Sequence, residues 1–143
     1  MTTYWLGVAA KQHVAAGVQG GYAQLGHGKH AAVASLQPGD WLIYYAPRET
    51  LDGGDAVQAF VAAGRVMSNA PYQVDAGGGF RPHRVDVAYE AGQQAAVRPL
   101  LSKLNLTCDL GSHWGAAFRT SKRRLTERDA QLIAEAMGVD LGG

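Results

Sequence analysis

Residues 37–48 read QPGDWLIYYAPR, in which a tight turn leads at once into a short apolar run. Pro38 presets its own backbone dihedral angle, Gly39 accepts a positive φ, and Asp40 can bond back to the turn. Local chemistry therefore predicts the start of a strand at this point. The run ends in two tyrosines and a proline, and such rings either complete a core or stack on a flat ligand.

The length and the cysteine content of the chain limit its architecture. With 143 residues it suits a single domain, residues 1–143, which is large enough to bury a core without metal or disulfide crosslinks. Cys108 is the only cysteine, so an intramolecular disulfide is excluded and a reducing, cytoplasmic setting is favoured. No apolar run has the length of a membrane span, and the amino terminus lacks a secretion signal. We expect a soluble, cytoplasmic protein with no membrane partner.

Positive charge is clustered, although the net charge is only +1. The balanced total argues against a protein that coats nucleic acid through bulk electrostatics. Residues 118–129 nevertheless contain a basic group set against the single acid Glu127. The members of this group are Arg119, Lys122, Arg123, Arg124 and Arg128. A smaller group consists of Arg81, His83 and Arg84. Each group is either a solvated face or a surface for phosphates.

Apolar spacing and turn residues predict the other elements of the fold. Besides the strand after Asp40, strands are expected at residues 4–9, 56–67 and 80–89 and, as a short one, near Ala117. Helices are expected at residues 11–17, 31–36, 98–104 and 126–137. Gly64 indicates a bulge or a sharp coil of the kind that a small barrel needs. Central strands with helices at both ends predict an α+β fold with a curled sheet, and not a doubly wound parallel sheet.

Four segments of the chain resemble the EVE domain family. They read YWLGVA at 4–9, LGHGKH at 25–30, LQPGDWLIYYAPR at 36–48 and NLTCDLGSHWGAAFR at 105–119. The resemblance spans nearly the whole chain, and LTERDAQLIAEAMG near the carboxyl end is also similar. It implies a PUA-like pseudo-barrel of the superfamily that includes ASCH and YTH modules, with a mostly antiparallel curled sheet flanked by short helices. It also implies binding of nucleic acid, with a flipped and modified base held in a pocket.

The resemblance puts the wall of this pocket at the ends of the first two strands and in two loops. The residues that it carries over to the base pocket are Gln24, His27, Tyr44, Tyr45, Pro47 and Trp114. Since neighbouring residues of a strand point to opposite faces, we expect only one ring of the tyrosine pair in the pocket and the other in the core. Trp114 either stacks on the ligand or plugs the barrel end, whereas Trp5 and Trp41 are expected in the core. Ala46 stands where similar motifs carry a small hydroxyl residue, which removes one hydrogen bond to the ligand.

These features favour a non-enzymatic reader of a modified base, with a modified cytosine in DNA as the first choice. A base pulled from a duplex loses a few kcal/mol of stacking, and each aromatic face returns about 1–3 kcal/mol. The residues expected to hold the nucleic-acid backbone are Lys29, Arg81, Arg119, Lys122, Arg123 and Arg124. A role in defence against modified foreign DNA would require a separate nuclease partner, because the sequence contains no cleavage motif.

Two other functions remain open at this point. Related barrels are similar in reading RNA, and nothing in the sequence reports contact with a ribose hydroxyl. A small-molecule-binding or hydrolytic domain would use Cys108 with His113 as a thiol and imidazole pair, although short spacing does not create that geometry. The spacing of His27, His30 and His113 fits no familiar zinc pattern, so we expect no metal and no cofactor.

Overall fold

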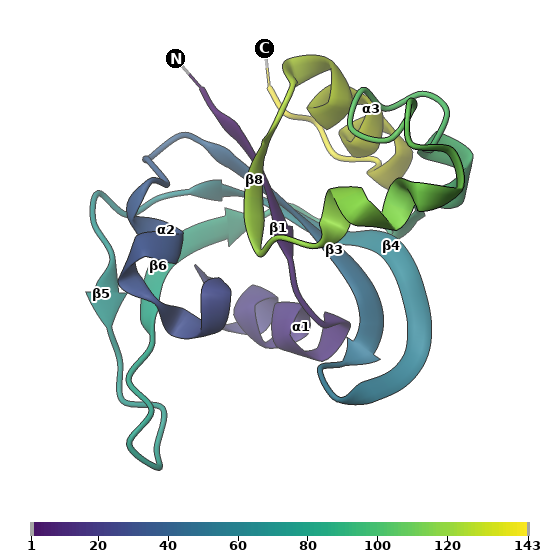
Figure 1. Cartoon of the computed structure of the whole chain (residues 1–143). Helices are drawn as coiled ribbons and strands as arrows, with labels where there is room; N and C mark the ends of the chain where they lie inside the picture. Colours follow the sequence, from purple (N-terminus) through teal and green to yellow (C-terminus); the bar gives the residue numbers. More distant parts are fainter. Residues whose placement is uncertain (1, 143) are drawn as a thin grey trace.

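The architecture is a strongly curled sheet, seen in a computed structural model that describes residues 2–142 (Figure 1). Six strands follow the order β2-β6-β4-β3-β1-β8, while β5 pairs with β6 and β7 pairs with β4. The strands are β1 Tyr4–Val8, β2 Tyr22–Ala23, β3 Trp41–Thr50, β4 Gly53–Val66, β5 Tyr72–Gln73, β6 His83–Tyr89, β7 Ala95–Ala96 and β8 Lys122–Leu125. β1 and β3 run parallel, and the other pairings of the described strands are antiparallel. The predicted α+β class and mostly antiparallel curled sheet are confirmed.

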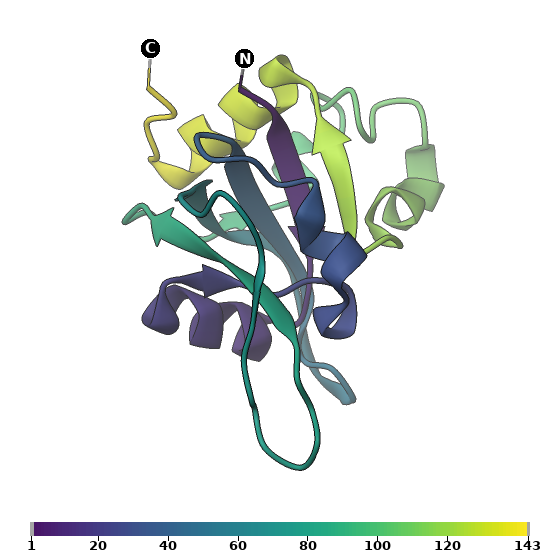
Figure 2. The same cartoon turned by 90° about the vertical axis from the view of Figure 1, so that its left-hand side faces the viewer.

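Helices cover both faces of this sheet (Figures 1 and 2). They are α1 Lys11–Gly20, η1 Gly26–Gly28, α2 His30–Ala34, η2 Arg98–Leu100, η3 Gly111–Phe118 and α3 Glu127–Met137. One core lies between the sheet and α3, η2 and η3, and the second lies between the sheet and α1 and α2. The side chain of Thr126 accepts a hydrogen bond from the Asp129 backbone N–H and Gly138 ends α3 with φ 73°, as the sequence predicts.

The segment 41–46 is buried because β3 supplies side chains to both cores. Trp41, Ile43 and Tyr45 point into the core beneath α3, whereas Leu42 and Tyr44 point into the core beneath α1 and α2. A strand covered on both faces needs no polar alternation, which explains the continuous apolar run. The burial of Trp41, and that of Trp5 in the α1 core, confirms the core assignment of both indoles.

Asp40 links the turn before β3 to β1. Its buried carboxylate accepts hydrogen bonds from the Thr3 and Gln37 backbone N–H groups and from Trp5 Nε1, at 2.9–3.0 Å. A parallel pair of strands has no hairpin turn to set its register. The Asp40 carboxylate fixes this register instead, with Tyr4 opposite Trp41.

The long β3–β4 hairpin contains the irregularities that curl the sheet. Its register shifts between Tyr44 and Tyr45 and twice more before the turn, and Gln58 on the facing strand has φ 48°. A bulge of this kind bends a strand and raises its twist. Gly64 has a different role from the predicted bulge: a Cβ there would lie 2.6 Å from Val87 Cγ1, so glycine permits the close approach of β6.

Other predicted elements differ in position or type. Ala117 lies in η3 and not in a strand, because its neighbours lack alternation and pack as a tight helix against the core; the strand follows later, as β8. α1 continues past Gly17, where a Cβ would lie 2.7 Å from the Tyr22 carbonyl oxygen, and it ends at Gly20, with Gly21 as its C-cap. β2, β5 and β7 have two residues each, too few for a sequence pattern.

Candidate functional site

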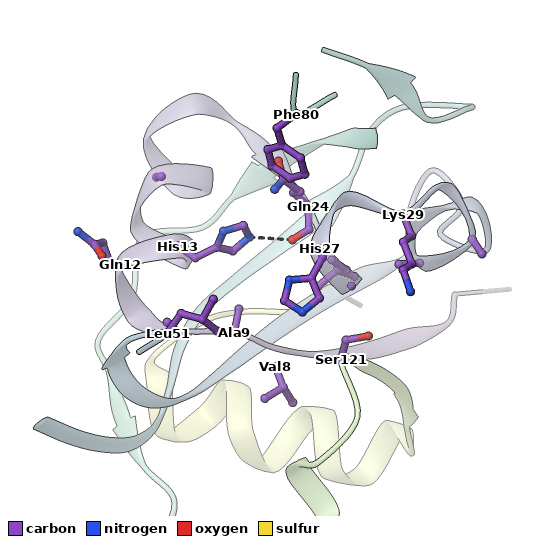
Figure 3. Close-up of a pocket in the computed structure, with 16 residues that line it drawn as sticks. Val8, Ala9, Gln12, His13, Gln24, His27, Lys29, Leu51, Phe80 and Ser121 are labelled. Atoms are coloured by element: carbon purple, nitrogen blue, oxygen red, sulfur yellow. Dashed lines mark hydrogen bonds between the residues drawn. The ribbon is translucent and has the colours of Figure 1, made fainter. Parts of the chain in front are cut away.

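A cavity of about 790 Å³ opens beside the end of β1, between α1, η1 and α2 (Figure 3). Its apolar wall is made mostly of small side chains, and none of its described lining residues is an aspartate or a glutamate. The polar lining residues are Gln12, His13, Gln24, His27, Lys29 and Ser121. Volumes of about 300–1,000 Å³ are typical of small-molecule sites, so the cavity is large enough for a planar heterocycle.

The η1 loop presents His27 at the cavity because its two flanking glycines turn the backbone. Gly28 has φ 80°, and a Cβ there would lie 2.4 Å from Pro82 Cβ, so only glycine fits against the loop before β6. His27 itself has φ 59°, which is uncommon for a residue with a side chain. Strained backbone of this kind is concentrated at binding sites.

Gln24 and His13 form the polar part of the wall. Gln24 is 8% exposed, and its Oε1 accepts a hydrogen bond from Arg84 Nε at 2.9 Å. The Gln24 backbone carbonyl lies 2.8 Å from His13 Nε2 (Figure 3). A carbonyl only accepts, so His13 Nε2 carries a proton and donates this hydrogen bond.

Two exposed apolar side chains lie at the rim of the cavity. Leu51, at the tip of the β3–β4 hairpin, is 80% exposed, and Phe80, in the loop that extends before β6, is 46% exposed. Figure 3 places Leu51 on the opposite side of the cavity from Lys29. Sequence reasoning did not find Phe80 as a site residue. One signal for it was present in the sequence: Phe80 directly follows the glycine run 77–79. Glycines have no side chain to pack against a neighbouring ring, so such a ring is free to contact a ligand.

The tyrosine pair does not line this cavity, because the sheet is covered on both faces at β3. Tyr45 stacks on Phe118 with ring centroids 3.9 Å apart, and burial raises the pKa of Tyr45 to about 12. Tyr44 is buried in the other core, where its hydroxyl shares hydrogen bonds with the Gln24 backbone and the Tyr89 hydroxyl. Burial raises the pKa of Tyr44 well above its usual value. The expectation that one tyrosine forms the wall is therefore corrected: Tyr44 lies behind Gln24 and supports it.

Pro47 and Trp114 also lie outside the cavity lining. Pro47 is half-buried on β3, past the doubly covered segment. Trp114 lies on η3, where it packs edge-on against Phe118 with centroids 6.2 Å apart and has the Arg98 guanidinium 5.5 Å from its ring. Of the two roles left open for Trp114, the structure corresponds to packing at the edge of the α3 core. Gln24 and His27 are thus the two predicted pocket residues that the cavity contains.

The basic group before α3 is divided by β8 and does not form one patch. Lys122 and Arg124 lie over the Trp5 ring, at 5.0 and 5.4 Å from its centroid, because they pair with Gly7 and Trp5 across the β1–β8 ladder. Arg123 points to the opposite face and donates to the Ala117 carbonyl at 3.4 Å. The expected common surface is therefore wrong, since alternate residues of a strand face opposite ways.

Lys122 also joins β8 to α2. Its ammonium group donates a hydrogen bond to Ser35 Oγ, and partial burial lowers the pKa of this lysine. Arg119, just before β8, is exposed. The neighbouring Ser121 lines the cavity, so the α2-facing side of β8 is continuous with the cavity mouth.

Lys29 follows η1 and Arg81 follows Phe80 in the loop before β6, and both of these segments contribute residues to the cavity lining. Lys29 is a lining residue, and both of these side chains are exposed. The two loops are in contact, since His83 Nδ1 donates to the Gly28 carbonyl at 3.3 Å. Within residues 2–142, the single ion pair joins Arg128 to Asp129. The cations near the cavity therefore have no acidic partner in the described chain.

The alternative catalytic pair is not assembled in the described residues. The exposed Cys108 thiol lies 3.9 Å from the Asn105 carbonyl oxygen, and no hydrogen bond joins it to His113. Across positions 2–142 there is no group of three or more histidine, cysteine, aspartate or glutamate side chains placed to hold a metal ion. None of the helices described is both long enough and apolar enough to cross a bilayer.

Comparison with known proteins agrees with this architecture. A sequence model of the EVE domain matches residues 3–136. A UPF0310 protein of Mesorhizobium japonicum is 42% identical over 140 residues, which cover 96% of this chain and 93% of the relative. UPF0310 protein YdcG of Bacillus subtilis is 39% identical over 142 residues, with coverages of 99% and 97%.

Two solved structures are similar in fold. The NMR structure of Rpa0253 from Rhodopseudomonas palustris has a TM-score of 0.58 and 17% identity, and it covers 96% of this chain and 94% of its own. The crystal structure of Atu2648 from Agrobacterium tumefaciens has a TM-score of 0.57 and 12% identity, with the same coverages. At such low identities the likeness concerns the fold alone.

Proposed function

Because the chain belongs to the EVE domain family, we propose that it binds nucleic acid and that its cavity receives a base turned out of the strand. A modified cytosine in DNA is the preferred ligand. Lys29 and Arg81 on one side of the mouth, with Lys122 and Arg124 on the α2 side of β8, hold the flanking phosphates. The protein is a binding module in this proposal, and any cleavage belongs to a separate nuclease partner.

The observation that carries this proposal is the contrast between an acid-free cavity and the unpaired cations beside it. A neutral planar heterocycle tolerates small apolar walls, and a phosphate next to it requires positive charge. Phe80 offers an exposed ring at the rim, in place of the buried tyrosines. Base stacking on such a ring contributes about 1–3 kcal/mol.

The distribution of charge also suggests a path for the strand. The β3–β4 hairpin on the Leu51 side carries Glu49, Asp52 and Asp55, which repel phosphates. Lys29 lies on the opposite side (Figure 3). The strand is therefore expected to cross the mouth between the loop before β6 and β8, and to avoid the hairpin.

Titration with fluorescent single-stranded oligonucleotides tests the proposal. The set contains one central cytosine, methylated cytosine or hydroxymethylated cytosine, in deoxy and ribo forms, at low and at physiological salt. We expect preference for one modified deoxy strand and a fall in affinity with salt. Preference for the ribo strands would turn the assignment to RNA. Equal and negligible binding to every strand would remove the proposal.

Single substitutions separate the cavity from the cationic rim. Phe80→Ala should reduce the preference for the modified base, whereas Lys29→Ala should weaken all strands alike, by about 1 kcal/mol or less at physiological salt. Lys103→Ala, which removes an exposed charge that is not among the cavity-lining residues, is the matched control and should change neither quantity.

A further inference from the structure

The Gln24 amide is held at the cavity wall with one of its two polar atoms occupied. Arg84 Nε can only donate, so the atom that faces it at 2.9 Å has to be the Gln24 oxygen. Nε2, with its two N–H donors, makes no hydrogen bond within the part of the chain that the structure describes. No fully buried side-chain nitrogen or oxygen there lacks a partner, so Nε2 keeps accessible surface, and Gln24 is a lining residue of the cavity.

Arg84 opposes rotation of the amide, and further contacts hold the Gln24 backbone in place. Gln24 follows β2, and the β2–β6 register, continued by one residue, sets it opposite Arg84. The Arg84 guanidinium lies 3.8 Å from the Tyr22 ring centroid, a cation–π contact that holds its orientation. The Gln24 backbone is held by His13 on its carbonyl and by Tyr44 from behind. If the amide were reversed, the N–H donors of Gln24 Nε2 would face the N–H donor of Arg84 Nε, which is unfavourable at a buried site.

We propose that Gln24 Nε2 reads the bound heterocycle by donating a hydrogen bond to a ring carbonyl oxygen or ring nitrogen, and that Arg84 is the positioning residue that keeps the amide in this orientation. The inference rests on the proposed function, since it needs a heterocycle in the cavity. A site with a fixed buried donor rejects a ligand of the same shape that has no acceptor, because the donor is then left unpaired.

Nuclear magnetic resonance of isotope-labelled protein tests the donor directly. The probes are deoxycytidine, methylated deoxycytidine and the difluorotoluene deoxynucleoside, which has the shape of a base without strong acceptors. The Gln24 side-chain amide resonances, assigned by their loss in Gln24→Glu, should move with the first two probes and stay unmoved with the third. The inference would be overturned if the Gln24 amide resonances moved with none of the three probes. It would also be overturned if they moved as far with the difluorotoluene nucleoside as with the two cytidines.

Variants of Arg84 test the positioning role. Arg84→Met frees the amide to rotate, so the ratio of affinities for deoxycytidine over the acceptor-free analogue should fall about fivefold, and Arg84→Lys should restore part of it. Lys103→Met removes an exposed charge outside the cavity lining and should leave the ratio unchanged. Thermal denaturation identifies variants that fold. A folded Arg84→Met protein with the ratio of the original protein would overturn the role of Arg84.

The oligonucleotide experiment tests the nucleic-acid function and the nucleoside experiment tests the Gln24 donor, so one can be disproved without the other. Amide resonances that respond to nucleosides, in a protein that binds no oligonucleotide, would support the donor and remove the nucleic-acid function. Oligonucleotide binding without any response of the Gln24 amide would remove the donor and leave the function in place.

Discussion

The two faces of β3 carry similar apolar residues, yet one face is covered by a closed core and the other lies beside an open cavity. On the closed face, toward α3, Tyr45 and Phe118 stack with ring centroids 3.9 Å apart, and Trp114 packs edge-on against Phe118. On the open face, toward α1 and α2, small side chains such as Ala16 and Ala32 line a cavity of about 790 Å³. Large rings fill the space between layers, whereas alanines leave it empty. The stacked rings of Tyr45 and Phe118 therefore fill the α3 side, whereas Trp5 and Tyr44 are buried on the α1 side without closing the cavity.

The largest effect is expected when the same truncation is made on each face. Phe118→Ala should lower the free energy of unfolding by about 3–5 kcal/mol, because it removes a buried ring from a packed stack. Phe80→Ala, at the rim of the open face, should lower it by less than about 1 kcal/mol. Urea denaturation measures both values. Similar losses for the two variants would contradict the division into a closed and an open face.

A methyl group at Gly28 should have the next largest effect, since it tests whether the open face is tightly built at its rim. Gly28→Ala should cost about 2–3 kcal/mol, because it combines positive φ with a contact at 2.4 Å from Pro82 Cβ. Gly111→Ala has positive φ and no atom within 4 Å of the added Cβ, so it should cost only about 1 kcal/mol. The difference between the two variants, measured by thermal denaturation, isolates the Pro82 contact. Equal losses of stability in the two variants would show that Pro82 moves away from the added methyl group and that the rim is not tightly packed.

Filling the cavity should alter binding and leave stability unchanged. Ala16→Leu places a larger side chain on the cavity side of α1 and should weaken binding of the preferred oligonucleotide about tenfold. Ala15→Leu changes the adjacent exposed residue of the same helix, which is not among the lining residues. It should bind as the original protein does. Leucine is a good helix former, so the unfolding free energy of both should change by less than about 0.5 kcal/mol.

The smallest effect concerns the pH dependence of the closed face. Burial raises the pKa of Tyr45 to about 12, so the folded protein keeps this proton at pH values where the unfolded chain has lost it. Stability from this group is complete below about pH 10 and falls as the pH rises toward 12. In Tyr45→Phe the fall in unfolding free energy between about pH 9 and about pH 11 should be shallower. Urea midpoints at the two pH values provide the measurement, and an unchanged slope would contradict it.

Sequence patterns predicted the elements whose cause is local. The turn at 37–40, the doubly buried run after it and the capped helix at 127–137 each follow from residues close together in the chain. The pattern near Ala117 predicts a strand, because no neighbouring residue indicates that Phe118 stacks on Tyr45. The pattern around Gly64 predicts a bulge, because the close approach of β6 involves a segment that is distant in sequence and leaves no local signal.

The site was less predictable than the fold. The family resemblance places Gln24 and His27 in the pocket, and the glycines beside His27 form turns whose cause is local. The tyrosines of β3 were misplaced because their position depends on helices that cover both faces, which no property of the strand reports. Phe80 and Leu51 line the cavity from two loops that are distant in sequence, so only the folded chain shows that both reach it.

The carboxylate of Asp40 has a consequence for the size of the cavity. It closes a loop of chain from Thr3 to Asp40, and this loop includes α1, η1 and α2. A slip of β1 by two residues would keep every side chain on its own face, yet it would carry Val8 and Ala9 about 7 Å along β3. By fixing the register of β1, the buried carboxylate of Asp40 therefore sets the size of the cavity at the opposite end of that strand.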